Sequence, residues 1–96
     1  MTPEGKVKKD IKAYLDEIGA YHFWPVPRGF GQQGIDCYAC IEGIFWAIEV
    51  KKEGVCEPTK RQSETLKQVS AAKGQTVCGD AKHIINLIKY VMQHVD

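Results

Sequence analysis

Two short apolar runs of the chain, residues 35–41 and 44–52, flank the dipeptide Glu42-Gly43. Runs of this length around a turn-forming pair are typical of two strands joined as a hairpin. If the turn has two residues, the last residue of the first run pairs with the first residue of the second. The second strand then has one wholly apolar face, which we expect to lie in the core: Ile44, Trp46, Ile48 and Val50.

Three further segments of the chain repeat their apolar residues at helical spacing. We expect helices over residues 3–18 and 60–73, and a third helix that begins after Asp80. Residues 21–26 and 75–78 are short apolar or aromatic runs and are interpreted as strands. The resulting order is helix, three strands, helix, strand, helix. This order predicts a mixed α/β fold in which helices flank a central mixed sheet.

Residues that favour helix ends stand at the predicted ends of the helices. Thr2, Thr59 and Asp80 are of the types that accept hydrogen bonds from the first backbone N–H groups of a helix. Gly19 and Gly74 are suited to the left-handed conformation that ends many helices. The last helix has a broad apolar face, which consists of Ile84, Leu87, Ile88, Val91 and Val95.

Length and composition are those of one small globular domain, and we expect residues 1–96 to form a single domain. The apolar stretches are far shorter than the roughly 20 residues that span a bilayer, so no membrane segment is expected. The first residues lack the apolar core of a signal peptide, which favours a cytoplasmic location. The net charge of +1 does not by itself indicate a nucleic-acid partner.

Four cysteines raise the question of a zinc or redox site. Cys37 and Cys40 have the C-x-x-C spacing of such sites. On a strand, however, a separation of three places the two thiols on opposite faces, which is unfavourable for chelation. The sequence offers no second pair to complete a zinc site, and disulfides are rare in a reducing compartment. We therefore expect the cysteines to act as small buried hydrophobes.

The hairpin brings two carboxylates together. Asp36 lies opposite Glu49 in the register set by the turn, which puts their Cβ atoms about 5 Å apart. Like charges in that position repel, so stability alone would select against them. Lys51 is two residues beyond Glu49 and therefore on the same face of the strand. A divalent cation would relieve the repulsion, and a metal site is our starting hypothesis.

Two more polar residues point inward from helices. Glu4 falls within the apolar stripe of the first helix, one turn before Val7. It either complements the helix dipole or serves a function at the core-facing side. Gln62 completes a T-x-x-Q capping box with Thr59, and it also shares a face with the apolar residues of its helix. His22 lies in an aromatic strand, where packing is favoured over a catalytic role.

The loop of residues 28–34, RGFGQQG, contains a match to the dinucleotide-binding pattern G-x-G-x-x-G. That pattern must follow a strand and open a helix, whereas this loop leads into a strand, so no nucleotide cofactor is expected. Arg28 is available for a phosphate group. A nucleic-acid backbone would also meet Lys52, Lys60 and Arg61, whereas Lys8, Lys9 and Lys12 are equally consistent with a solvated helix surface.

The chemistry of these residues suits phosphodiester hydrolysis. Asp36, Glu49 and Glu4 offer hard oxygen ligands, which Mg²⁺ or Mn²⁺ prefers, and the carbonyl of Val50 would add another. A metal at this place polarises a phosphodiester and helps to generate a hydroxide nucleophile. Lys51 would orient the attacking water or stabilise the developing negative charge. Gln62 would hold the water or Lys51 in place.

The segments Gly34-Ile35-Asp36 and Glu49-Val50-Lys51, separated by twelve residues, resemble the core motif of the PD-(D/E)XK nuclease superfamily. The surrounding sequence is most similar to its VRR-NUC (virus-type replication-repair nuclease) branch. The strand FWAIEVK and the helix start PTKRQ, which contains Gln62, both match that branch, and Glu4 matches its N-terminal helical acid. Ile35 departs from the pattern, since the superfamily usually has proline there.

The resemblance implies a restriction-endonuclease-like core of order αβββαβα and a Mg²⁺- or Mn²⁺-dependent DNA endonuclease. Its catalytic residues would be Asp36, Glu49, Lys51, Gln62 and Glu4. Similar stand-alone domains are associated with homodimers that act on branched DNA, such as four-way (Holliday) junctions or flaps, and a phage or mobile-element origin would fit. The alternative is a non-catalytic DNA-binding or assembly module that retains the nuclease fold.

Overall fold

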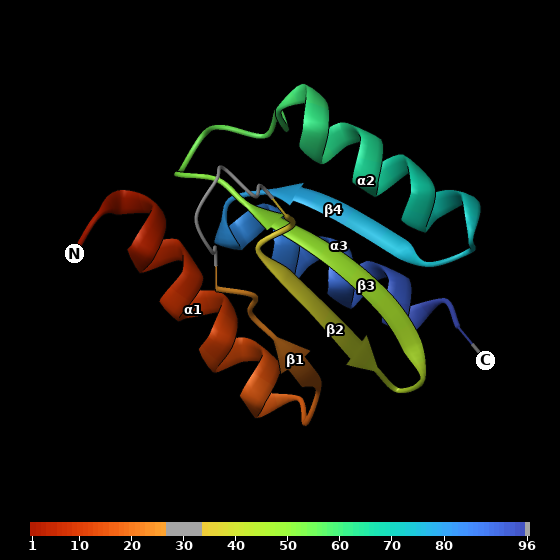
Figure 1. Cartoon of the computed structure of the whole chain (residues 1–96). Coiled ribbons are helices and arrows are strands. Elements are labelled where there is room, and N and C mark those ends of the chain that lie inside the picture. The colour runs from red at the N-terminus through yellow and green to blue at the C-terminus, as the bar shows by residue number, and fades with distance from the viewer. Residues whose placement is uncertain (27–33, 96) are drawn as a thin grey trace.

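A computed structural model describes residues 1–26 and 34–95 of the chain. Three helices and four strands follow one another in these residues (Figure 1). In chain order they are α1 (Pro3–Glu17), β1 (Tyr21–Phe23), β2 (Cys37–Ile41), β3 (Ile44–Val50), α2 (Lys60–Ala71), β4 (Gln75–Gly79) and α3 (Ala81–Gln93). The predicted order αβββαβα is therefore confirmed.

The four strands form one mixed sheet in the order β1-β2-β3-β4. β1 and β2 are antiparallel, as are β2 and β3, whereas β3 and β4 are parallel. The β2–β3 hairpin has the predicted register, with Ile41 paired to Ile44. Its two turn residues, Glu42 and Gly43, both have positive φ angles, of 49° and 85°. Two such residues form the hairpin turn whose twist matches that of the flanking strands.

The two faces of the sheet are covered unequally. α1 and α3 pack against each other and against one face, where they bury an apolar core (Figure 1). The core includes the predicted Trp46, Ile48 and Val50 of β3, which are fully buried. α2 lies against β3 and β4 on the opposite face, which carries Glu49. The site predicted at Glu49 is thus on the α2 side of the sheet, beside the core rather than within it.

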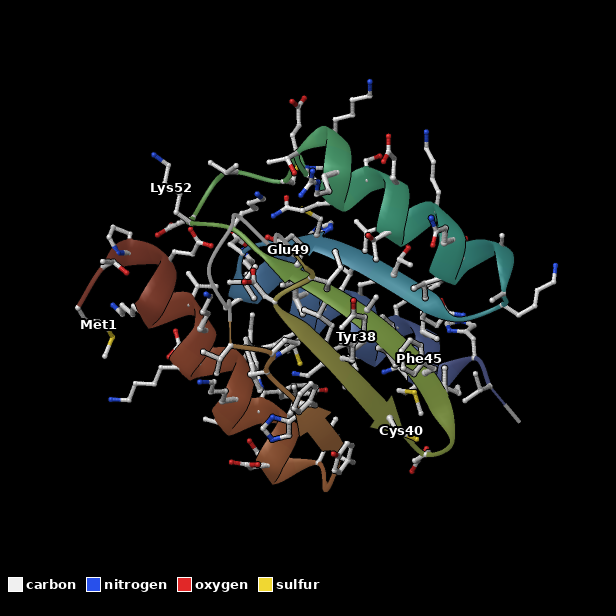
Figure 2. All side chains as sticks on the ribbon, in the orientation of Figure 1. Met1, Tyr38, Cys40, Phe45, Glu49 and Lys52 are labelled. Atoms are coloured by element: carbon white, nitrogen blue, oxygen red, sulfur yellow. The ribbon has the colours of Figure 1, made fainter. Side chains whose placement is uncertain are left out.

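The part of the second face formed by β2 and the start of β3 carries aromatic side chains. Tyr38 and Phe45 stack with ring centroids 5.8 Å apart, and Phe45 is 47% exposed (Figure 2). Side chains two residues apart on a strand share a face, so Tyr38 lies on the same face as Asp36. The aromatic pair is therefore on the face of the sheet that carries the carboxylates.

Several predicted element boundaries differ from the structure. β1 ends at Phe23 rather than at residue 26, consistent with Pro25, which cannot donate a ladder hydrogen bond. β2 begins at Cys37 and β3 ends at Val50, so Asp36 and Lys51 lie just outside the paired strands. α1 ends one residue earlier than predicted, and Gly19 follows its C-cap with a φ of 74°. Val95, which was expected on the apolar face of the last helix, lies beyond α3 and is 40% exposed.

The end of α2 was predicted incorrectly. Gly74 was expected to adopt the left-handed conformation after the helix, but Lys73 does so, with a φ of 75°. Gly74 serves a different purpose, because a Cβ atom at that position would lie 2.7 Å from Cγ1 of Val69 and 3.2 Å from Cδ2 of Phe45. Gly74 thus allows the segment after α2 to pack closely against Val69 of α2 and Phe45 of β3.

The cysteines do not behave alike. Cys37 is fully buried, as expected, and burial raises the pKa of its thiol to about 12. Cys40 and Cys56 are exposed and Cys78 is half-buried, so the expectation of four buried cysteines was wrong. Cys40 is exposed because it lies on the opposite face of β2 from the core. None of the helices in residues 1–26 and 34–95 is long and apolar enough to cross a membrane.

Candidate metal centre

Three carboxylates from separate parts of the chain meet at one end of the sheet. Glu4 lies in the first turn of α1, Asp36 precedes β2, and Glu49 is the penultimate residue of β3. Each offers one oxygen, and these three oxygens lie within 4.8 Å of one another. Glu49 is only 2% exposed, and Glu4 is the most exposed of the three. Such a cluster of like charges is unfavourable without a cation or a bound proton.

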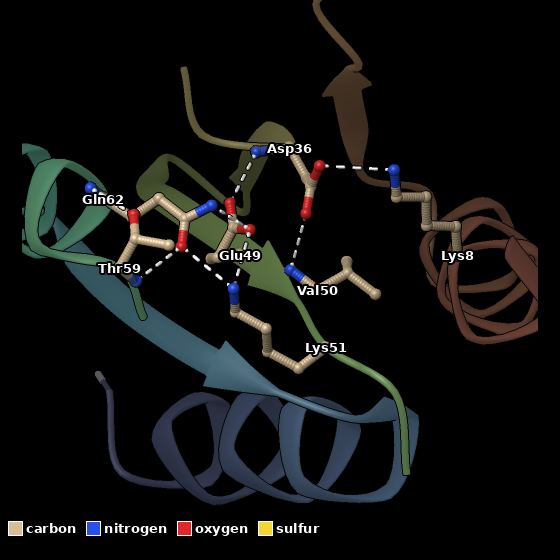
Figure 3. A network of polar contacts seen from close by, with 7 residues as sticks. All are labelled: Lys8, Asp36, Glu49, Val50, Lys51, Thr59 and Gln62. Carbon is tan, nitrogen blue, oxygen red and sulfur yellow. Dashed lines mark hydrogen bonds and ion pairs between the residues drawn. The ribbon is translucent and has the colours of Figure 1, made fainter. Parts of the chain in front are cut away.

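Backbone groups hold the two hairpin carboxylates in place (Figure 3). The N–H of Asp36 donates to Oε1 of Glu49 at 3.1 Å, and the N–H of Val50 donates to Oδ2 of Asp36 at 2.9 Å. The last paired residues of the hairpin are Cys37 and Ile48. Beyond them, hydrogen bonds from backbone to side chain replace the ladder. This exchange ends the pairing of β2 with β3, while β3 stays paired with β4 as far as Val50, and it fixes the positions of both carboxylates.

Gln62 joins Glu49 to Lys51 (Figure 3). Its amide nitrogen donates to Oε2 of Glu49 at 2.7 Å, and its amide oxygen accepts from Nζ of Lys51 at 3.0 Å. Nζ of Lys51 is also 3.7 Å from Oε2 of Glu49. The structure therefore brings together the five side chains that were predicted to form the site: Glu4, Asp36, Glu49, Lys51 and Gln62.

The same Gln62 side chain forms the predicted capping box. Its amide oxygen accepts from the N–H of Thr59 at 2.9 Å, while Oγ1 of Thr59 accepts from the N–H of Gln62 at 3.2 Å. The prediction that Gln62 caps its helix is confirmed, and the same side chain contacts Glu49 and Lys51. The start of α2 is thus fixed by the same side chain that contacts the carboxylates.

Burial is the main electrostatic influence on Glu49. Burial, together with the neighbouring charge and side-chain hydrogen bonding of Asp36, raises the pKa of this carboxyl group to about 8, while the backbone N–H of Asp36 and the charge of Lys51 offset part of the effect. With no metal ion beside it, this shift favours the protonated form of Glu49 over the ionised form near neutral pH. A divalent cation would favour the ionised form, because it stabilises negative charge on both carboxylates.

Lys8 is a member of the site that sequence reasoning missed. Its Nζ lies 3.3 Å from Oδ1 of Asp36, with side-chain exposures of 36% and 20% (Figure 3). The helical spacing could have identified it, because Lys8 comes one turn after Glu4 and therefore lies on the same face of α1. Lys8 was left open between a nucleic-acid contact and a solvated helix surface, and its ion pair with Asp36 is neither, whereas Lys9 is exposed.

The other basic candidates lie beside the site or outside the described residues. Lys52 follows Lys51 directly, and Lys60 and Arg61 form the start of α2 just before Gln62. All three are exposed. Arg28 and the glycine-rich loop fall within residues 27–33, outside the part of the chain that the structure describes, apart from Gly34.

His22 has a structural environment. Its Nε2 lies 2.7 Å from Oδ1 of Asp16, and the indole N–H of Trp24 donates to its Nδ1 at 2.8 Å. These contacts join the end of α1 to the residues around β1. They support the packing role that was favoured for His22 over a catalytic one.

The donor set fits a hard divalent cation. Three carboxylate oxygens within a few ångströms suit Mg²⁺ or Mn²⁺, which bind through oxygen, better than they suit zinc with its preference for nitrogen and sulfur. Glu4, Asp36 and Glu49 are also the only group of three or more acidic, histidine or cysteine residues found close enough to hold an ion in residues 1–26 and 34–95. The geometry is thus compatible with the predicted metal.

Comparisons with known proteins agree with this fold. Neither a protein-family model nor a curated protein sequence matches the chain. A solved structure described as a VRR_NUC domain superposes with a TM-score of 0.76 at 24% sequence identity, over 93% of this chain and 97% of that one. The resemblance noted in the sequence is therefore confirmed at the level of structure: the chain has the fold of a VRR_NUC domain.

Proposed function

We propose that residues 1–96 form a single nuclease domain that hydrolyses DNA phosphodiester bonds with the help of Mg²⁺ or Mn²⁺. The observation that carries this proposal is the grouping of Glu4, Asp36 and Glu49, with oxygens within 4.8 Å of one another, beside Lys51 and Gln62. A domain that only binds DNA gains nothing from facing carboxylates, because they repel the phosphate backbone as well as each other.

Asp36, Glu49 and Glu4 are the side chains that would hold the ion. The carbonyl of Val50 is a further candidate ligand, because the N–H and C=O of a strand residue point to the same side and its N–H points to Asp36. The bound ion would polarise the phosphodiester and lower the pKa of an attacking water. The hydrogen bonds from Asp36 and Val50 keep the carboxylates in place before the ion arrives.

Lys51 supplies a positive charge beside this ion site. Gln62 holds its Nζ at 3.0 Å, so the ammonium group is positioned rather than free to rotate into solvent. From there it can donate a hydrogen bond to a phosphate oxygen as negative charge develops, or orient the attacking water. Gln62 is then a positioning residue, and Asp36, Glu49 and Lys51 are the residues of the reaction itself.

The substrate we propose is branched DNA, such as a four-way junction or a flap, and the active form is a homodimer. Both statements rest on the similarity of the sequence to stand-alone nucleases of the VRR-NUC branch. Lys52, Lys60 and Arg61 lie next to the site in the sequence and are proposed to contact the DNA backbone. Contacts of this kind position DNA without reading its bases, so selectivity would depend on the shape of the substrate.

The test is cleavage of labelled linear, flap and four-way DNA in the presence of Mg²⁺, Mn²⁺ or EDTA. We expect cleavage with either metal, none with EDTA, and a loss of about 100-fold or more for Asp36→Asn, Glu49→Gln and Lys51→Ala. Lys89→Ala is the matched control, because Lys89 lies in α3, which packs on the opposite face of the sheet, and it should cleave normally.

Cleavage that survives in the Asp36 and Glu49 variants would show that the activity arises elsewhere. DNA binding without cleavage in any metal would instead favour the non-catalytic DNA-binding module. A preference for linear over branched DNA would remove the proposed substrate class while leaving the nuclease assignment intact.

A further inference from the structure

The carboxylate oxygens of the hairpin pair have partners of two kinds. Backbone N–H groups and Gln62 contact Oδ2 of Asp36 and both oxygens of Glu49. These partners belong to the hairpin itself or to a capped helix, so their positions are fixed. Oδ1 of Asp36 differs, because its partner is the long side chain of Lys8 from α1, at 3.3 Å. The other ammonium group near the pair, that of Lys51, lies 3.7 Å from Oε2 of Glu49 and is held by Gln62. The Lys8 ammonium is a monovalent cation in contact with a ligand of the proposed metal site.

We propose that Lys8 acts as a competing counter-ion that a divalent cation displaces from Asp36 on binding, and so lowers the affinity of the site for Mg²⁺ and Mn²⁺. This inference rests on the proposed function, since it assumes that Asp36 is a metal ligand. It concerns the affinity of the site for the metal ion, which the carboxylates alone do not determine.

Electrostatics favours the exchange. A divalent ion beside Asp36 and the Lys8 ammonium carry the same sign, so they repel strongly at the short separation that a shared carboxylate imposes. The pair is also only partly buried, with Lys8 36% exposed, so the ammonium can move toward solvent without being stranded in the core. A partly exposed ion pair is weak. Breaking it when the metal binds should therefore lower the metal affinity by only a modest factor and should not prevent binding.

Lys12 provides a matched comparison on the same helix. It lies one turn beyond Lys8 and carries the same charge, but its Nζ lies over the ring of Trp24, 4.8 Å from the centroid. Removing Lys12 changes the net charge of α1 by the same amount as removing Lys8 and leaves the contact with Asp36 in place. The pair of variants therefore separates the specific contact from the general loss of positive charge.

The experiment is a titration of the full chain with Mn²⁺ in the absence of DNA, followed by the electron paramagnetic resonance signal of free Mn²⁺. We expect Lys8→Met to bind Mn²⁺ about three-fold more tightly than the wild type, or better. Lys12→Met should change the affinity less than Lys8→Met does. Lys8→Arg, which keeps the charge and can pair with a carboxylate through two N–H groups, should bind no more tightly than the wild type.

Two outcomes would overturn the inference while leaving the metal site in place. One is Mn²⁺ binding by Lys8→Met that is unchanged or weaker than in the wild type. The other is equal tightening by Lys8→Met and Lys12→Met, which would assign the effect to net charge. Lys8→Gln is a second neutral variant if Lys8→Met melts at a clearly lower temperature.

Failure of the proposed function is recognisable in the same titration. If the wild type shows no saturable Mn²⁺ binding, or if Glu49→Gln binds as well as the wild type does, the carboxylate cluster is not the metal site. The role of Lys8 would then fall together with the proposed function. Saturable binding that Glu49→Gln abolishes keeps the two questions separate.

Discussion

Gln62 is the residue at which folding and proposed chemistry meet. One side chain receives a hydrogen bond from the N–H of Thr59 at the start of α2 and also connects Glu49 to Lys51. A capping residue is normally replaceable, because several residue types serve as caps at similar cost. Here the amide is needed, since it donates to a carboxylate with one atom and accepts from an ammonium group with the other. Glutamate could accept but not donate.

Variants of Thr59 and Gln62 should therefore separate the two roles. Thr59→Ala removes a cap and should lower the free energy of unfolding by about 1 kcal/mol, with little change in cleavage. Gln62→Glu can still complete a capping box, but its carboxylate would face Glu49 and lose the donated hydrogen bond. We expect it to lose about 10-fold or more in cleavage. Thermal melting followed by circular dichroism, beside the cleavage assay, measures both effects.

Equal loss of cleavage in Thr59→Ala and Gln62→Glu would contradict this division of roles, because it would mean that the position of α2 alone controls the site. Normal cleavage by Gln62→Glu would mean that Lys51 finds its position without the amide. Lys67→Ala, in the same helix but exposed and without a role in the site, serves as the control for changes within α2.

At the scale of elements, the sequence predicted a feature correctly where neighbouring residues determine it, and failed where contacts with distant residues do. The β2–β3 hairpin was predicted with its register, because the Glu42-Gly43 turn and the flanking apolar runs determine it without help from the rest of the chain. The contact of Asp36 with Glu49 followed from that register. The end of α2 was not predictable in this way. A glycine was expected at the left-handed position, but Lys73 occupies it, and the next residue, Gly74, packs closely against Val69.

This difference leads to opposite expectations for two neighbouring residues. Lys73→Gly removes the cost of a left-handed conformation for a residue with a Cβ atom, and we expect the free energy of unfolding to rise by roughly 1 kcal/mol. Gly74→Ala would place a Cβ atom 2.7 Å from Cγ1 of Val69, so it should lower that free energy by about 1–3 kcal/mol. Urea unfolding of the two variants beside the wild type measures both changes.

The double variant Gly74→Ala with Val69→Ala is the control, because it removes the methyl group that the new Cβ atom would meet. It should lose less stability than the two single changes added together. Stabilisation by Gly74→Ala alone, or destabilisation by Lys73→Gly, would show that the glycine is needed for its backbone conformation after all.

At the scale of the whole molecule, the site depends on how α1 is docked on the sheet. Ile11 and Leu15 are fully buried in the core with Trp46, and this packing brings the first turn of α1 to the end of the hairpin. The inward direction of Glu4 could be predicted from the helical stripe. The contact of Lys8 with Asp36 could not, because it depends on the docking angle of α1, which long-range packing sets.

A metal ion bound to Glu4, Asp36 and Glu49 would join the first turn of α1 to the hairpin. That turn is held at its end by Thr2, which accepts from the N–H of Gly5 at 2.9 Å and from the N–H of Lys6 at 3.0 Å. Helix ends open readily because few contacts restrain them. We therefore expect Mn²⁺ to slow hydrogen exchange in the first two turns of α1 as well as at Val50.

The expected size of this slowing of hydrogen exchange follows from mass action. At Mn²⁺ concentrations about 100 times the dissociation constant, openings that break the site should become roughly 100-fold rarer. Glu4→Gln should abolish the slowing in α1 while keeping part of the slowing at Val50, because Asp36 and Glu49 still bind there. The amides in the middle of α3 are the internal control, since local openings of that helix do not involve the site. Slowing at Val50 with none in α1 of the wild type would show that Glu4 is not a ligand and that its acid serves the helix dipole alone.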